Sequence, residues 1–403
     1  RDRDVTGVQT CALPICINPA RLHMTFVNEG GEGRRRAGGD NTPLLPPSPL
    51  MELPAGTMTS ADWLRASGYA TAHFGKWHVG RSDPRQHGFD ESDGANANGG
   101  PANLPNPNPA EGQRLTQRGL DFMTRMAAAG KPFYLQLDHY GGKEPADVLP
   151  ETWADIAGRA GAAGRAGAAG HAKEIGSAAV MQDMDAQIGL VLAKISALGL
   201  ADSTYVVYTA DHGTPGSNAP LAGGKGTLWD GGLRVPLLVR GPGIAAGSHC
   251  SQRVVNCDLL PTVLDLAGLT APLPAAVDGG SLAGLLRNGG QGSVVRSCED
   301  LVFHYPHYDM DANGPGSAII AGDLKLTRYD EGPSLHLYDL AKDPGEQHDL
   351  AAAQPDQVAA LQARLDAWLD AAGAQRVTRN PHYLPTAAPP VTERGKGRGG
   401  RLP

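Results

Sequence analysis

The stretch that decides the fold runs from Tyr205 to Ile244 and reads YVVYTADHGTPGSNAPLAGGKGTLWDGGLRVPLLVRGPGI. It opens with four apolar residues, 205–208, a run typical of a parallel strand that is buried on both faces. The run leads into Asp211 and His212, so an acid and an imidazole are predicted at the carboxyl end of a strand. Open α/β sheets bind their ligands at that edge. Lys225 follows among three glycines, which leaves its ammonium group open to an anion.

A second strand is predicted at 235–239, and the residues before the first strand predict a long helix. From Ile175 to Leu198, apolar residues recur at helical spacing, and Gly199 ends the pattern. Residues 69–74 and 132–140 read as further strands. This alternation of helices and strands predicts an α/β fold with a doubly wound, mostly parallel central sheet flanked by helices. The tandem GRAGAA repeat within 158–170 is interpreted as a flexible low-complexity insertion.

The C-terminal part has a different pattern. Residues 317–326 and 334–340 alternate apolar and polar side chains around a turn at 330–333, which predicts an antiparallel hairpin. A last amphipathic helix is predicted from about Pro355 to Ala371. We therefore expect a smaller C-terminal unit, residues 291–380, made of an antiparallel sheet and a helix. Residues 381–403 are rich in proline, glycine and basic residues, and we expect them to be disordered.

Composition excludes some partners and leaves others open. The chain has 403 residues and a formal net charge of −7, so no bulk basic field favours nucleic acid. The sequence contains no run of 18 or more apolar residues, so no membrane span is predicted. The five cysteines are odd in number and lack metal-site spacing, although Cys250 and Cys257 could pair across a turn. The abundance of glycine and alanine indicates a GC-rich bacterial genome.

The string Gly75-Lys76-Trp77-His78 follows the predicted strand at 69–74. In extended backbone Lys76 and His78 point to the same face, because side chains alternate with a period of two. Two cationic groups on one face repel each other unless an anion or a carboxylate lies between them. The alternative is an exposed lysine beside a packed histidine.

Taken together, these strings resemble the sulfatase family, the formylglycine-dependent branch of the alkaline-phosphatase superfamily. The resemblance rests on "GYATAHFGKWHVG" at 68–80 with "HGFD" at 87–90, on "ADHG" at 210–213, and on "GKG" with "W-x-G-G-x-R-V-P" at 224–236. Further similarities lie at 258–268, at 278–282 and in "DPGE" at 343–346. The string FHYPHY at 303–308 resembles one common near the substrate mouth of polysaccharide-directed members. The resemblance covers most of residues 17–385.

The resemblance implies roles for particular residues. It gives Asp211 and His212 as metal ligands, Lys76 and Lys225 as sulfate contacts, and His78 as the acid-base group. Lys143 stands where the family has a histidine that contacts the sulfate; it can neutralise a sulfate as a point charge. A divalent metal is expected, Ca²⁺ first because of its oxygen ligands, with Mg²⁺ possible because His212 adds a nitrogen.

The N-terminal residues depart from the family pattern. Residues 1–16 resemble the read-through of a sequencing adaptor and are interpreted as not belonging to the natural protein. Cys16 precedes Pro19 and Arg21 in a spacing one residue too long for the family's Cys-x-Pro-x-Arg motif. We therefore expect residues 17–290 to form the catalytic domain without its first strand and nucleophile motif, and formylglycine to belong to the missing N-terminal part. On that interpretation the chain as printed is expected to be inactive.

The expected function is hydrolysis of a sulfuric ester, arylsulfatase-like, on a sulfated small molecule or glycan. One alternative is a phosphomonoester or phosphonate hydrolase of the same superfamily. The other is a non-catalytic relative that binds sulfated glycans, which Lys143 motivates. Family members are mostly periplasmic or secreted, and the same location is expected here, although no signal peptide is recognisable in this chain.

Overall fold

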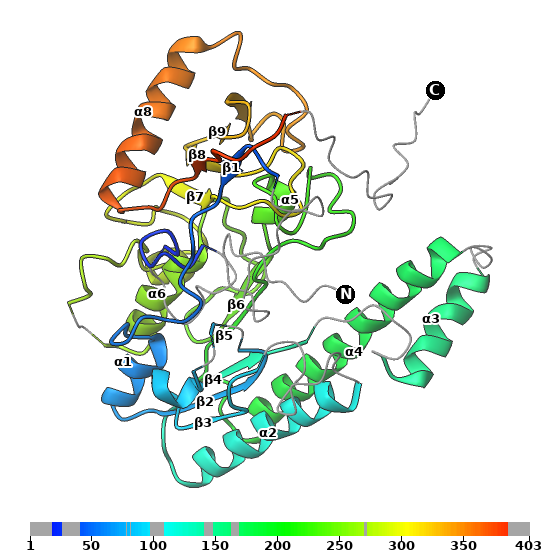
Figure 1. Cartoon of the computed structure of the whole chain (residues 1–403). Coiled ribbons are helices and arrows are strands. Elements are labelled where there is room, and N and C mark those ends of the chain that lie inside the picture. The colour runs from blue at the N-terminus through cyan, green and yellow to red at the C-terminus, as the bar shows by residue number, and fades with distance from the viewer. Residues whose placement is uncertain are drawn as a thin grey trace.

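A parallel sheet of three strands, in the order β3-β2-β4, forms the lower half of the molecule in Figure 1. The structure is a computed structural model that describes residues 18–25, 41–77, 79–80, 82–96, 109–140, 148–162, 169–269 and 272–385. β2 (Ala70–Gly75) pairs with β3 (Glu91–Ser92) on one edge and with β4 (Phe133–Asp138) on the other. The carboxyl ends of β2 and β4 meet at the same edge, as predicted.

Helices bury this sheet. Helix α2 (Pro109–Ala128) packs Leu115 and Phe122 against Ala72 and Phe74 of β2. On another side, α1 (Ser60–Ala66) contacts α6 (Leu259–Leu266) through a cluster of buried leucines, Leu64, Leu260 and Leu264. Helix α1 begins at a capping box between Thr59 and Asp62, which satisfies main-chain donors of its first turn.

Strand β5 (Val206–Thr209) pairs in antiparallel fashion with β6 (Leu237–Arg240), with Val207 opposite Val239. All four residues of β5 are half-buried. The prediction that this run is a parallel strand buried on both faces is therefore wrong. Within the described residues β5 pairs along one edge only, and its partner is an antiparallel strand.

A long helix lies beside α2, and a shorter helix packs against that long helix. Helix α4 (Ala169–Ala197) contacts both α2 and α3 (Pro150–Ala162). Its predicted apolar stripe is half-buried at most positions and fully buried at Ile195. The GRAGAA repeat is not wholly a flexible insertion, because residues 158–162 end α3 and residues 169–170 begin α4. Alanine has the highest helix propensity, which accounts for this difference.

The upper half of Figure 1 is an antiparallel sheet covered by α8 (Pro355–Ala371). Its strands follow the order β10-β9-β8-β7, namely β7 (Leu301–Tyr305), β8 (Gly316–Ala321), β9 (Leu324–Tyr329) and β10 (Ser334–Asp339). The four residues at helical spacing in α8 are all buried against this sheet: Val358, Leu361, Leu365 and Leu369. The smaller antiparallel sheet with its helix is thus confirmed.

The beginning of the described chain lies against this upper half. Strand β1 (Leu44–Leu45) pairs with β11 (Thr378–Arg379), and Asn380 Nδ2 donates to the carbonyl of Thr42 at 2.8 Å. Residues 381–385 also contact this segment, since the amide of Leu384 donates to Asn41 Oδ1 at 2.8 Å. The rest of the predicted disordered tail lies outside the described residues.

Short elements complete the fold: η1 (Pro84–His87), α5 (Asp230–Leu233), η4 (Asn256–Asp258) and α7 (Ala283–Arg287). Among the described helices, none has the length and apolar character needed to span a bilayer. The suggested pairing of Cys250 with Cys257 is not present: neither residue forms a disulfide, and Cys250 lies at the surface whereas Cys257 is buried.

Candidate functional site

Lys76 follows β2 directly and turns over the end of β4. Its amide donates to the carbonyl oxygen of Asp138 at 2.9 Å. The preceding Gly75 has φ 103°, and a Cβ built there would lie 2.0 Å from that same oxygen. Only glycine satisfies both constraints, so the turn requires the residue that the sequence provides. The lysine is thereby held at the carboxyl edge of the parallel sheet.

Asp211 and His212 lie just beyond the end of β5. Asp211 Oδ1 accepts a hydrogen bond from the amide of His212 at 3.0 Å, while Asp211 Oδ2 lies 3.4 Å from His212 Nε2. His212 Nδ1 lies 2.8 Å from the carbonyl oxygen of Gly213, so we assign the ring proton to Nδ1. The lone pair of Nε2 and the carboxylate of Asp211 then face the same space, as a pair of metal donors would.

Lys225 belongs to a loop that folds back on this pair. Its amide donates to the carbonyl of Thr214 at 3.2 Å. Asn218 closes the same loop, because its Nδ2 donates to the carbonyls of Thr214 and Gly223 at 2.8 and 3.0 Å. Lys225 is only 8 % exposed. A lysine is seldom so buried unless it is paired, which makes it a candidate to hold an anion.

Electrostatics link these residues into one site. Burial lowers the pKa of His212, the carboxylate of Asp211 opposes that shift, and the positive charges of Lys225 and Lys76 lower the pKa further. The ring is therefore neutral at pH 7, the form that binds metals. Both lysines are close enough to act on this histidine. The structure thus brings together Lys76, Lys225, Asp211 and His212, four of the six predicted site residues.

The other two predicted residues, His78 and Lys143, lie outside the described residues. Their roles stay predictions. Neighbouring residues are described on both sides of His78: Trp77 is buried, and its amide donates to Asn96 Oδ1 at 3.3 Å.

Residues that sequence reasoning did not single out also lie at this edge. Buried His73 of β2 places its Nε2 2.8 Å from Asp138 Oδ2, and Gln136 Nε2 donates to the same oxygen at 2.8 Å. Next in the chain, His139 has a pKa that burial lowers, and its Nε2 has no hydrogen-bond partner among the described residues. The available signal was the alternation in PFYLQLD, which places Gln136 and Asp138 on one face of β4.

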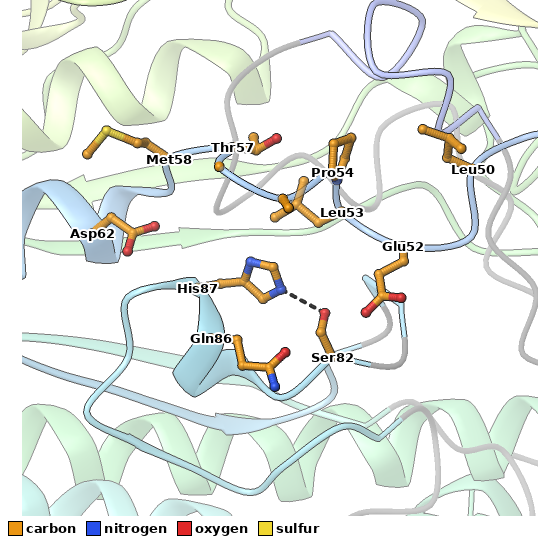
Figure 2. Close-up of a pocket in the computed structure, with 12 residues that line it drawn as sticks. Leu50, Glu52, Leu53, Pro54, Thr57, Met58, Asp62, Ser82, Gln86 and His87 are labelled. Atoms are coloured by element: carbon orange, nitrogen blue, oxygen red, sulfur yellow. Dashed lines mark hydrogen bonds between the residues drawn. The ribbon is translucent and has the colours of Figure 1, made fainter.

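A separate pocket of about 550 Å³ is lined by residues between 50 and 62 and by Ser82, Gln86 and His87 (Figure 2). Trp77 stacks on His87 of its wall, with ring centroids 5.7 Å apart. Ser82 Oγ and His87 Nε2 are 2.7 Å apart, a serine-histidine contact within the pocket wall. The four gathered site residues are not among the described residues that line it. No carboxylate in the described chain bonds His87 Nδ1, so the pair lacks the third group of a catalytic triad.

The FHYPHY string does not form an exposed mouth. His304 and His307 are 5 and 6 % exposed, and His307 Nε2 hydrogen-bonds to Thr25 Oγ1 at 2.8 Å. Burial lowers the pKa of His304 to about 4 and that of His307 to about 3. Both rings are neutral interior groups near physiological pH.

Two lysines, a carboxylate and an imidazole thus lie near one another, Lys76 beyond the end of β2 and the others beyond the end of β5 and in the loop that follows. Such a set of charges suits a hydrolase of anionic esters. The Sulfatase family model matches residues 34–269, more than half of the chain, and the model named N-sulphoglucosamine sulphohydrolase, C-terminal, matches residues 224–375. The chain belongs to the sulfatase family, whose members are sulfuric ester hydrolases.

Individual relatives agree with this assignment. Human arylsulfatase A is 29 % identical over 413 aligned residues, which cover 83 % of this chain and 77 % of the relative. The ulvan-active sulfatase of Formosa agariphila is 26 % identical, over 79 % of this chain and 66 % of that protein.

Solved structures share the fold. The structure of Ps i-CgsB in complex with k-i-k-neocarrahexaose has a TM-score of 0.67 at 19 % identity, over 89 % of this chain and 81 % of that chain. The phosphonate monoester hydrolase SpPMH from Silicibacter pomeroyi has a TM-score of 0.61 at 18 % identity, over 94 % and 90 %. At such identities these two similarities establish the fold alone.

Proposed function

We propose that this protein hydrolyses sulfate esters of a glycan, with Lys76 and Lys225 holding the sulfate group and Asp211 and His212 contributing to a metal site. The observation that supports the proposal is the proximity of these residues: Asp211 Oδ2 lies 3.4 Å from His212 Nε2, and both lysines are near enough to lower the pKa of that ring. A sulfate ester is anionic and has a poor alkoxide leaving group. An enzyme for it must collect positive charge and supply a proton.

Lys225 supplies the stronger of the two protein charges. A charged hydrogen bond from a buried ammonium is worth about 1.5–3 kcal/mol, more than the same contact at the surface. Lys225 is 8 % exposed, whereas Lys76 is half-buried. His78, the residue after Trp77, is proposed as the proton donor to the leaving oxygen, and Lys143 as a further sulfate contact.

The metal fit is partial. The 3.4 Å between Asp211 Oδ2 and His212 Nε2 suits two neighbouring ligands of one ion, and Nδ1 of that ring is already held by a carbonyl, the second contact that metal-binding histidines usually make. Ca²⁺ takes six to eight ligands. No cluster of three or more potential ligands occurs among the described residues. A bound metal would supply further positive charge to the sulfate; we favour Ca²⁺, with Mg²⁺ as the alternative.

The nucleophile is proposed to be a formylglycine, as membership of the sulfatase family implies. The three described cysteines, Cys250, Cys257 and Cys298, lie outside the loops that carry Lys76, Asp211 and Lys225. The glycan substrate is supported by similarity to the ulvan-active sulfatase. A periplasmic or secreted location is proposed because the family resemblance implies it.

The first test is binding of inorganic sulfate by the chain as printed, measured by calorimetry beside Lys225→Met. We expect Lys225→Met to lower the sulfate affinity tenfold or more. The control Lys131→Met, which removes an exposed lysine, should leave the sulfate affinity unchanged. Equal sulfate affinity in the wild type and Lys225→Met would refute the assigned role.

The second test is turnover by the protein, with p-nitrophenyl sulfate and p-nitrophenyl phosphate as substrates. Preference for the sulfate supports the proposal, and preference for the phosphate supports the phosphoester alternative. Binding of a sulfated oligosaccharide without turnover of either ester would support the non-catalytic alternative, which Lys143 motivates.

A further inference from the structure

Three charged side chains meet in the interior between the Lys225 loop and the C-terminal sheet. Lys325 of β9 places its Nζ 2.9 Å from Asp230 Oδ1 and 2.7 Å from Glu346 Oε1. The side chains of Lys325 and Glu346 are fully buried, and that of Asp230 is 8 % exposed. The three residues come from β9, from the first position of α5 and from the turn after β10. We refer to them as the charge triad.

Burying the charge triad costs desolvation free energy. Two carboxylates share one ammonium group, so the buried set carries a net negative charge when all three are ionised. Burial raises the pKa of Glu346, and the charge of Lys325 opposes that shift. Apolar residues of similar volume commonly replace buried ion pairs without loss of stability. Stability alone therefore does not explain the triad, whereas fixing one geometry does.

Main-chain hydrogen bonds connect the charge triad to the proposed site. The amide of Asp230 donates to Glu346 Oε2 at 2.7 Å. Two residues on, the carbonyl of Gly232 accepts from the amide of Gly213 at 3.0 Å, next to His212. Between them, the amide of Gly231 donates to the carbonyl of Ala222 at 2.7 Å, which ties α5 to the loop that carries Lys225.

The backbone segments joined by these hydrogen bonds are tightly packed. A Cβ at Gly213 would lie 1.7 Å from the carbonyl oxygen of Gly231, and one at Gly232 would lie 2.4 Å from that of Gly224. The backbones of α5, the Asp211–Gly213 segment and the Lys225 loop are therefore in direct contact. A shift of Asp230 must move all three, since packed interiors transmit displacement.

We propose that the Lys325–Asp230–Glu346 triad is a positioning device that fixes the Lys225 loop and the Asp211–His212 pair, so that the C-terminal sheet is part of the anion site. The effect on an anion rests on the proposed function, whereas the effect on the loop does not. These residues act through Asp230 and α5, and none of them is proposed to touch the substrate.

The test compares Lys325→Met with a matched control elsewhere. Arg296 and Asp258 form an equally buried ion pair at 2.6 Å, 4 and 0 % exposed, whose further hydrogen bonds go to Arg253, Val255 and Gly280. Arg296→Met therefore breaks a buried pair without touching the loop. Glu346→Gln is a milder second variant, because its amide oxygen can still accept the Asp230 hydrogen bond.

Two readouts are measured on each protein: amide hydrogen exchange by mass spectrometry and affinity for inorganic sulfate. For Lys325→Met we expect exchange in residues 211–233 to rise tenfold or more, while β2 and α8 keep the wild-type rate, and sulfate affinity to fall at least tenfold. Glu346→Gln should show the same pattern at about threefold. Arg296→Met should lower the melting temperature and leave both readouts of the loop unchanged.

Loop exchange within twofold of wild type in both triad variants would overturn the proposal, and so would a uniform rise across the chain. If Lys325→Met does not fold, Glu346→Gln decides by the same criteria. A wild-type chain that binds no sulfate would count against the proposed function, and the exchange pattern would still decide the positioning role.

Discussion

Gly213→Ala tests whether the Asp211–His212 pair depends on a glycine immediately after it. The added Cβ would lie 1.7 Å from the carbonyl oxygen of Gly231, where real contacts do not fall below 3.0 Å. The segment must therefore move by more than an ångström, and the 3.0 Å hydrogen bond from the Gly213 amide to Gly232 would break. Overpacking costs about 1–3 kcal/mol and the lost bond about 1 kcal/mol, so we expect about 2–4 kcal/mol of destabilisation.

The assay is thermal unfolding together with sulfate calorimetry. For a chain of this length the destabilisation corresponds to a fall of about 2–5 °C in melting temperature. Gly216→Ala is the control in the same loop, because its Cβ would meet only Thr214 Oγ1 at 3.6 Å, an ordinary contact. We expect that control to stay within about 0.5 kcal/mol of wild type. Equal melting temperatures for the two variants, with unchanged sulfate affinity, would refute the reasoning.

Three further predictions concern the metal, the pH response and the core. Calorimetry of the chain should show Ca²⁺ binding no tighter than about 10⁻⁴ M, because the described residues bring only two donors together, Asp211 and His212; a micromolar dissociation constant would contradict this. Stability should fall between pH 7 and pH 5 by about 2 kcal/mol for each of His304 and His307, because their folded pKa values, about 4 and about 3, lie below the unfolded value and the unfolded chain binds protons first. Urea unfolding at the two pH values measures this, and a His307→Gln variant that keeps the full slope would speak against it. Leu365→Ala, at a fully buried position of α8, should cost about 2–5 kcal/mol in the same assay, with exposed Ala359→Ser near zero.

Local patterns predicted the elements well where one face decides the burial. In α8 the spacing of Val358, Leu361, Leu365 and Leu369 placed all four residues in the core. The alternation also indicated an antiparallel sheet, but the segment predicted as one strand, 317–326, is divided between β8 and β9, which pair with each other. The same approach predicted the wrong pairing for β5. An apolar run indicates that the side chains favour burial, but it does not indicate which strand lies beside them. The described β5 has only β6 as its neighbour.

The candidate site was predicted in part for a similar reason. Lys76, Asp211, His212 and Lys225 all stand at the ends of predicted strands or in glycine-rich loops, where local sequence indicates function. The charge triad could not be found that way. Lys325 and Asp230 are 95 residues apart, and Asp230 and Glu346 are 116 apart. The motif containing Glu346 was recognised only as a similarity to the family, since the buried partners of Glu346 belong to other elements.

The net charge of −7 and the proposed binding of an anion are compatible because the relevant charges are local. Exposed charges farther than about 8–10 Å from the site are largely screened at physiological ionic strength. Lys225 is buried, and the effective dielectric constant around it is lower than that of water, so its charge acts more strongly on a nearby group. Asp211 is more exposed, with 36 % of its side chain accessible, which weakens its repulsion of an anion. Burial of the Lys225 ammonium group therefore makes this loop favourable for an anion. The contacts that keep Lys225 buried contribute to anion affinity as much as the lysine itself does.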